Sequence, residues 1–226
     1  MFRLFKLSEL HYKDNDLGLA ICNYCSSEHL GLLVKNENEP ISHYDFIQHN
    51  SPFYKGEIRE DHLCKFSSYF DEDTIITFNN TLSYVLDELA NNDLPFSIIF
   101  SEDVLDMDLS NLMESIGIGF TCTTIILGIF HYINLDLIDK STWPIGLLED
   151  ISFQKDIVDN LMVDYPEHAE KQRAYIGNVP RFSPSQILIA FIIYIGDPVK
   201  YSDIEPYIKS VKTQINEHDL LLETSQ

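Results

Sequence analysis

The stretch from Gly119 to Ile133, GFTCTTIILGIFHYI, holds no charged residue and carries a cysteine, Cys122, near its start. A run of this kind must be buried, either in the core of a domain or in a bilayer. The wider uncharged region from Ile116 to Ile133 is about as long as a marginal membrane span. It also contains three threonines, three glycines and His131, and no basic residue flanks its end. We therefore expect a helix buried at the centre of a domain and no membrane span.

Thr121 is a suitable N-cap, so the helix is predicted to run from Cys122 to about Tyr132. A thiol in the first helical turn lies at the positive end of the helix dipole, which favours the thiolate. The backbone N–H groups beside it can donate to a developing oxyanion. Cys122 is therefore well placed for acyl transfer. The same local pattern also fits a small apolar core residue, because free cysteine is among the most buried residue types.

The net charge of the 226-residue chain is −21, with only 15 lysines and arginines. This balance argues against a nucleic-acid-binding surface, which needs clustered basic residues. It is typical of a well-solvated acidic surface, and it is also compatible with the binding of a basic protein partner. The chain begins without the apolar stretch and small-residue cleavage site of a secretory signal. Four cysteines in a chain of this length do not form a disulfide framework, so we expect a cytoplasmic protein with reduced thiols.

The hydrophobic pattern predicts strands first and helices last, which is an α+β arrangement. The polar stretch KNENEP between two β-compatible runs predicts a hairpin over residues 29–49. We expect an α+β core over residues 1–145 and a helical extension over residues 146–226 that packs on it. The predicted strands are 17–25, 29–36, 41–49 and 94–100, and the predicted helices are 80–91, 122–132, 150–163, 167–174, 184–195 and 202–217.

Two histidines of the predicted hairpin are candidate partners for Cys122. His29 begins one strand and His43 lies in the next, so pairing of the two strands brings them close. One imidazole can exchange a proton with the thiol while the other orients it. His49, six residues after His43, has the same strand parity and is a rival for either role. Each histidine alone also fits an ordinary hydrogen-bonded strand residue.

Three segments in this order, EHLGLLVKN, ISHYDF and GFTCTTIILGIF, resemble the circularly permuted NlpC/P60 group of papain-like folds, which includes the lecithin:retinol acyltransferase-like enzymes. In that group a histidine begins a strand, a second polar residue lies on the neighbouring strand, and the nucleophilic cysteine begins a packed helix. The GxTCxT run also resembles a family of uncharacterised bacterial proteins. The resemblance covers about residues 17–133.

The resemblance implies a permuted papain-like core, in which an antiparallel sheet packs on the helix that begins at Cys122. It further implies that Cys122 attacks a carbonyl, that His29 is the general base and acid, and that His43 or His49 orients His29. The expected activity is that of a cysteine hydrolase or acyltransferase acting on a small molecule, a lipid or a peptide, without a cofactor or a metal. The competing interpretation is a non-catalytic, immunity-type protein that binds a basic partner.

Cys22, Cys25 and His29 resemble half of a zinc site, for which His62 and Cys64 are the only candidates for a second pair. The spacing of that second pair is unusual for zinc, so thiols in or beside a strand are the expected state of these cysteines.

Overall fold

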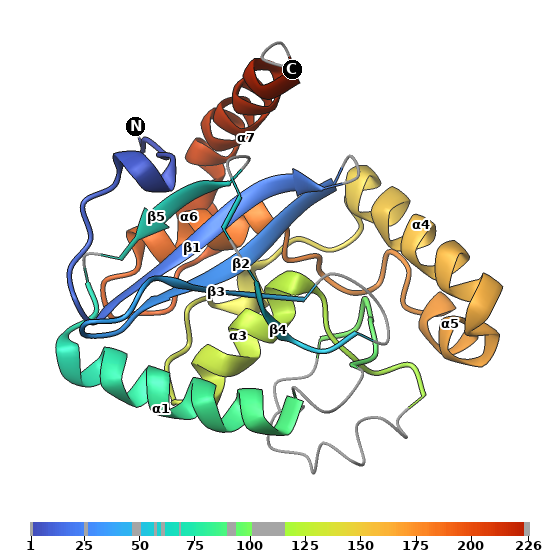
Figure 1. Cartoon of the computed structure of the whole chain (residues 1–226). Coiled ribbons are helices and arrows are strands. Elements are labelled where there is room, and N and C mark those ends of the chain that lie inside the picture. Colours follow the sequence, from blue (N-terminus) through green and yellow to red (C-terminus); the bar gives the residue numbers. More distant parts are fainter. Residues whose placement is uncertain are drawn as a thin grey trace.

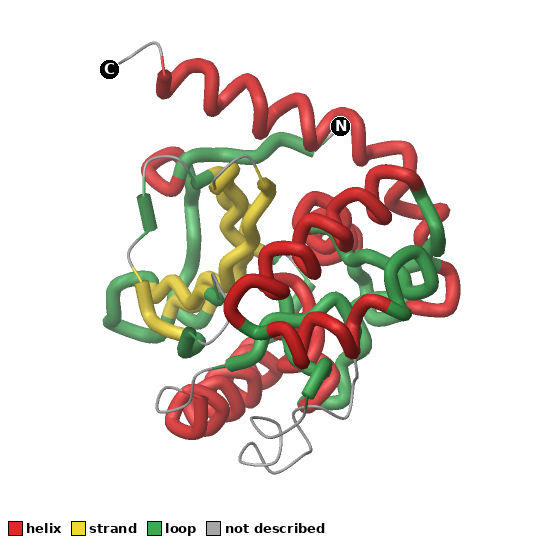
Figure 2. The backbone as a smooth tube through the Cα atoms, turned by 90° about the vertical axis from the view of Figure 1, so that its right-hand side faces the viewer, coloured by secondary structure: helices red, strands yellow, loops and turns green. Residues whose placement is uncertain are grey.

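The computed structural model describes residues 2–24, 27–46, 51–56, 58–59, 62–67, 69–89, 94–100 and 116–223. Within these residues the chain forms a five-stranded antiparallel sheet and six α-helices (Figures 1 and 2). This arrangement confirms the predicted α+β class.

The sheet has the strand order β4-β3-β2-β1-β5, and every neighbouring pair is antiparallel. Its strands are β1 (Asp16–Tyr24), β2 (Ser27–Lys35), β3 (Ser42–Asp45), β4 (Tyr54–Gly56) and β5 (Leu63–Phe66). The predicted hairpin is present, because β2 pairs with β3 and Leu33 faces His43. The second strand of this hairpin is shorter than predicted and ends at Asp45.

Both faces of the sheet are covered, which explains the nearly continuous apolar sequence of β2. Leu30, Leu32 and Val34 belong to the main hydrophobic core. Leu33, on the opposite face, packs in a smaller cluster against which Leu7 of the N-terminal segment lies. Alternation along β2 therefore divides the strand between two apolar layers.

The helices are α1 (Glu72–Leu89), α3 (Cys122–Tyr132), α4 (Leu148–Asp164), α5 (Pro166–Arg173), α6 (Pro184–Ile193) and α7 (Tyr201–Glu223). The predicted positions of α3, α4, α5 and α6 are confirmed within about two residues at most boundaries, whereas α1 begins earlier than predicted and α7 ends later. The predicted strand at residues 94–100 is absent as a strand. Phe96 instead forms an isolated parallel bridge with Phe120, next to Pro95, which has no N–H to extend a ladder.

Helix α3 is the buried centre of the molecule. All nine residues from Cys122 to Phe130 are buried, and the helix packs against β2 and α6. Figure 1 shows α3 beneath the sheet and beside α1. No helix within the described ranges is long and apolar enough to cross a membrane.

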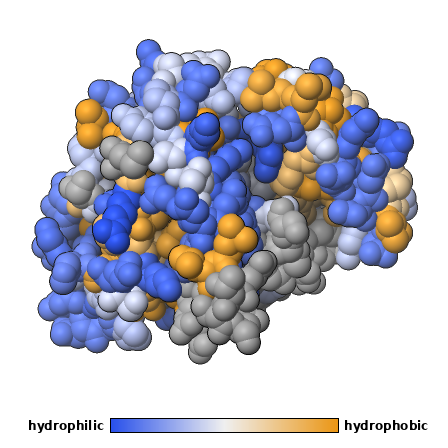
Figure 3. All heavy atoms as spheres, turned by 90° about the horizontal axis from the view of Figure 1, so that it is seen from above, coloured by the Kyte–Doolittle hydropathy of each residue, from blue (hydrophilic) through white to orange (hydrophobic). Residues whose placement is uncertain are grey.

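The helices that follow residue 146 pack in two different places. Residues of α6 and α7 belong to the main core, and these helices pack on β1 and β2. Helices α4 and α5 pack mainly on each other, around a separate small cluster that includes Val158 and Ala169, and lie to one side of the sheet (Figure 1). Seen from above, the molecule is largely polar, with scattered apolar patches, one of which lies on the side of these two helices (Figure 3).

Candidate active site

The start of α3 is held by a reciprocal cap. Thr124 N–H donates to Oγ1 of Thr121 at 3.2 Å, and Thr121 N–H donates to Oγ1 of Thr124 at 2.6 Å. This confirms Thr121 as the N-cap. The first N–H groups of a helix have no acceptor within the helix. The cap engages the N–H groups of Thr121 and Thr124. The N–H groups of Cys122 and Thr123 lie between them, at the helix start and beside the thiol.

Thr123 fixes this helix start against the segment before α6. Its buried hydroxyl donates to the carbonyl oxygen of Phe182 at 2.7 Å. The position of Cys122 is therefore set by its own helix and by the contact of the adjacent Thr123 with Phe182, almost sixty residues further along the chain.

His29 lies near the start of β2, beyond the part of the strand that pairs with β3. The ladder between β2 and β3 runs from Leu32 to Val34, so the edge of β2 is not paired with β3 at His29. The ring nitrogen Nε2 of His29 hydrogen-bonds with Oδ1 of Asp45, and both side chains are almost fully buried.

The side chain of Cys122 also hydrogen-bonds with His29. Burial alone would lower the pKa of His29, but the nearby Cys122 sulfur and the hydrogen-bonded Asp45 carboxylate outweigh it and raise the pKa to about 10. At neutral pH the imidazole is therefore positively charged. A cationic imidazole beside the sulfur is the environment that stabilises a nucleophilic thiolate.

Cys122 and His29 line the same cavity, which has a volume of about 200 Å³. Its walls combine the sheet and α3 with α4 and the segment before α6. The lining is mostly apolar, with Glu28 and Arg181 as its other charged groups. The apolar wall residues are Phe96, Ile98, Phe153, Ile157, Pro180, Phe182 and Pro184.

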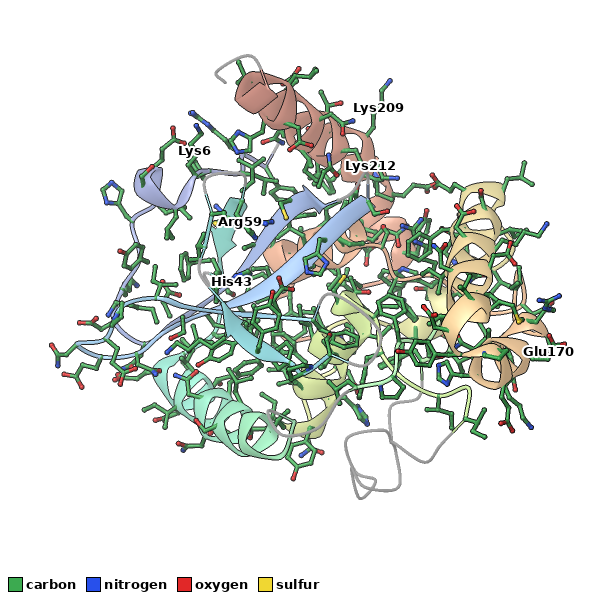
Figure 4. The ribbon with its side chains drawn as sticks, turned by 45° about the vertical axis from the view of Figure 1, so that its right-hand side comes forward. Lys6, His43, Arg59, Glu170, Lys209 and Lys212 are labelled. Carbon is green, nitrogen blue, oxygen red and sulfur yellow. The ribbon has the colours of Figure 1, made fainter. Side chains whose placement is uncertain are left out.

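Asp45 takes the orienting position that the sequence interpretation gave to His43. The ring of His43 packs edge-on against His62, with 4.9 Å between centroids, and a Cβ atom at Gly31 would collide with it. His43 does not line the cavity, and in Figure 4 it lies in the sheet region, far from α5. His49, the other predicted candidate, lies outside the described residues.

The sequence carries a signal that points to Asp45. Asp45 has the same strand parity as His43, and the pairing of Leu33 with His43, continued by two residues, places Asp45 opposite Gly31. A carboxylate is a common partner of a catalytic imidazole.

Cys22 and Cys64 lie close to each other, and Cys22 is the strand partner of His29 in the β1–β2 ladder. Burial, together with the neighbouring Cys22, raises the pKa of Cys64 to about 12. The Cys22 sulfur accepts a long contact of 3.9 Å from Arg59. Within the described ranges, which exclude Cys25, no three histidines, cysteines or carboxylates are grouped so that they could hold a metal ion.

Replacing Asp45 by asparagine is expected to lower the pKa of His29. The His29 pKa is raised partly by this carboxylate, so without it the imidazolium loses its proton at a lower pH than about 10. The measurement is the NMR titration of the His29 ring between pH 5 and 11. Asp136→Asn is the matched control, because Asp136 bonds to His131 at 2.8 Å on the exposed end of α3. An unchanged titration midpoint of His29 in Asp45→Asn would contradict the assignment of Asp45.

Comparison with known proteins adds no assignment. No protein-family model matches the chain, and neither a curated protein nor a solved structure matches it.

Proposed function

We propose that the protein is a cysteine hydrolase or acyltransferase that acts on an amide or ester bond through a thioester intermediate. The observation that carries this proposal is the buried series Cys122–His29–Asp45 at the wall of a cavity. The series combines a nucleophile at a helix start, a protonated imidazole and a carboxylate that orients the imidazole.

In the proposed reaction the Cys122 sulfur attacks the substrate carbonyl carbon, and the carbonyl oxygen becomes an oxyanion. The N–H groups of Cys122 and Thr123 donate to that oxygen. His29 gives its proton to the leaving nitrogen or oxygen as the bond to the carbonyl carbon breaks, which produces the thioester. A water molecule, or the hydroxyl or amine of an acceptor, then loses a proton to His29 and attacks the thioester. The acyl product leaves, and the sulfur and the protonated imidazole are restored.

The order of the elements supports a permuted papain-like core. The strand with His29 precedes the strand with the orienting residue, and the helix with Cys122 follows much later in the chain. The apolar cavity supports an acyl group, or an apolar side chain of a peptide, as the part of the substrate next to the nucleophile. We further propose that the enzyme acts in the cytoplasm.

The proposal is tested by mixing the protein with p-nitrophenyl hexanoate and measuring its intact mass at early times. We expect a hexanoyl adduct that maps to Cys122 and is lost on treatment with hydroxylamine. An adduct distributed over surface lysines, with Cys122 unmodified, would refute the proposal.

The net charge of −21 supports a second candidate, a non-catalytic acidic protein that binds a basic partner. This candidate predicts no acyl adduct at Cys122, so the same experiment separates the two functions.

A further inference from the structure

Arg181 stands at the junction of two hollows. It lines the cavity that contains Cys122, and it also lines an adjoining hollow of about 560 Å³. The two hollows share Ser27, Glu28 and Phe153 as well. A substrate that reaches Cys122 from the larger hollow therefore passes this arginine.

The guanidinium of Arg181 is held in place by the ring of Phe153 and the carboxylate of Asp150. Its carbon lies 3.6 Å from the centre of the Phe153 ring, so the two planes can stack, and Nη1 lies 3.6 Å from Oδ1 of Asp150. The side chain is only 18% exposed. A guanidinium has five N–H donors, and the contact with Asp150 joins one nitrogen to one oxygen. A guanidinium of this geometry can donate to Asp150 and to a ligand at the same time.

Arg181 and Lys212 are the basic residues among the described lining of the larger hollow, which Glu28, Glu149 and Asp156 also line. Glu28 accepts a hydrogen bond from the backbone N–H of Ser185 at 3.1 Å, so its carboxylate is held by the start of α6. Across the larger hollow, Glu149 pairs with Lys212 at 3.6 Å, and Figure 4 shows Lys212 on α7. Among the described residues that line the cavity, Arg181 is the only lysine or arginine.

We infer that Arg181 is a specificity-determining residue that binds a carboxylate or phosphate group of the substrate. The inference rests on the proposed function and deepens it. The substrate is an amide or ester that carries an apolar segment, which fills the cavity beside Cys122, and an anionic group at the mouth, which the guanidinium fork binds through two parallel hydrogen bonds.

The test compares anionic and neutral esters of equal length. The anionic substrates are the mono-p-nitrophenyl esters of adipic and pimelic acid, and the neutral ones are p-nitrophenyl hexanoate and heptanoate. We expect kcat/KM to be at least about ten-fold higher for the anionic ester of a matched pair, since hydrogen bonds to a charged group are worth about 1.5–3 kcal/mol. In Arg181→Gln this ratio should fall to about one. A phosphonate analogue of the adipate ester identifies which anion is preferred.

Arg173→Gln is the matched control. Arg173 lies on α5 and pairs at 3.2 Å with Glu170, which Figure 4 shows at the outer edge of the molecule. Its substitution should leave the ratio unchanged. Because Arg181→Gln leaves the buried Asp150 without its cation, the double variant Arg181→Gln/Asp150→Asn is measured in parallel, with melting temperatures for all variants.

The outcomes separate the two proposals. Equal rates for anionic and neutral esters in the wild type, or a preference that survives in both Arg181 variants, would overturn the role of Arg181 and leave the proposed function intact. Failure of every ester to acylate Cys122 would overturn both.

Discussion

Replacing Cys122 by alanine is expected to lower the rate of acyl transfer from p-nitrophenyl hexanoate by about 10⁴-fold or more, because the variant has no atom that can form the thioester. The helix start should remain intact. The cap is made by the side chains and backbone of Thr121 and Thr124, and Cys122 contributes no side-chain atom to it. The measurement is the release of p-nitrophenol together with the intact mass of the protein.

Cys64→Ala is the matched control for this experiment. Cys64 is also buried, but it lies in the small cluster on the other face of the sheet, and its pKa is raised to about 12. Its loss should leave acyl transfer within a few-fold of the wild-type rate. Wild-type rates in Cys122→Ala would show that the reaction takes place elsewhere on the protein.

Replacing His29 by glutamine is expected to lower kcat/KM by about 10²–10⁴-fold, which is the usual contribution of a general acid and base. Glutamine can still hydrogen-bond to Asp45, but it carries no positive charge and cannot transfer a proton. The Cys122 sulfur then loses the cation beside it, so its alkylation by iodoacetamide at pH 6 should slow as well. Activity and alkylation are expected to fall together.

His131→Gln serves as the control for His29→Gln. His131 lies in the last turn of the same helix as Cys122 and also pairs with an aspartate, Asp136, but this pair is partly exposed and lies at the opposite end of α3. Its substitution should change neither rate. If His29→Gln alkylated at the wild-type rate, the imidazole would not be the group that activates the thiol.

The parts of the fold that depend on local sequence could be predicted. The cap at Thr121 and the first turn of α3 follow from side chains within four residues of one another. The capping box at the start of α6 is equally local, since Gln186 accepts a hydrogen bond from Ser183 N–H at 3.1 Å. The hairpin of β2 and β3 follows from alternation and a polar turn.

The composition of the site depends on features that are not local. Whether His43 or Asp45 meets His29 is decided by the register of two strands, by where β3 ends and by the space over Gly31. The far wall of the cavity comes from α4 and from residues 180–184, which the sequence places only in a helical extension. Their approach to Cys122 is fixed by long-range contacts such as that of Thr123 with Phe182.

The central claim is that Cys122 is a nucleophile activated by its neighbours, and selective alkylation tests it most directly. The native protein is treated with iodoacetamide at pH 6, and the modification rates of Cys122 and Cys64 are followed by peptide mass spectrometry. We predict that Cys122 reacts at least about 100-fold faster than Cys64, because the protonated His29 lies beside the Cys122 sulfur, whereas burial raises the pKa of Cys64 to about 12. Equal, slow modification of the two cysteines would contradict the claim.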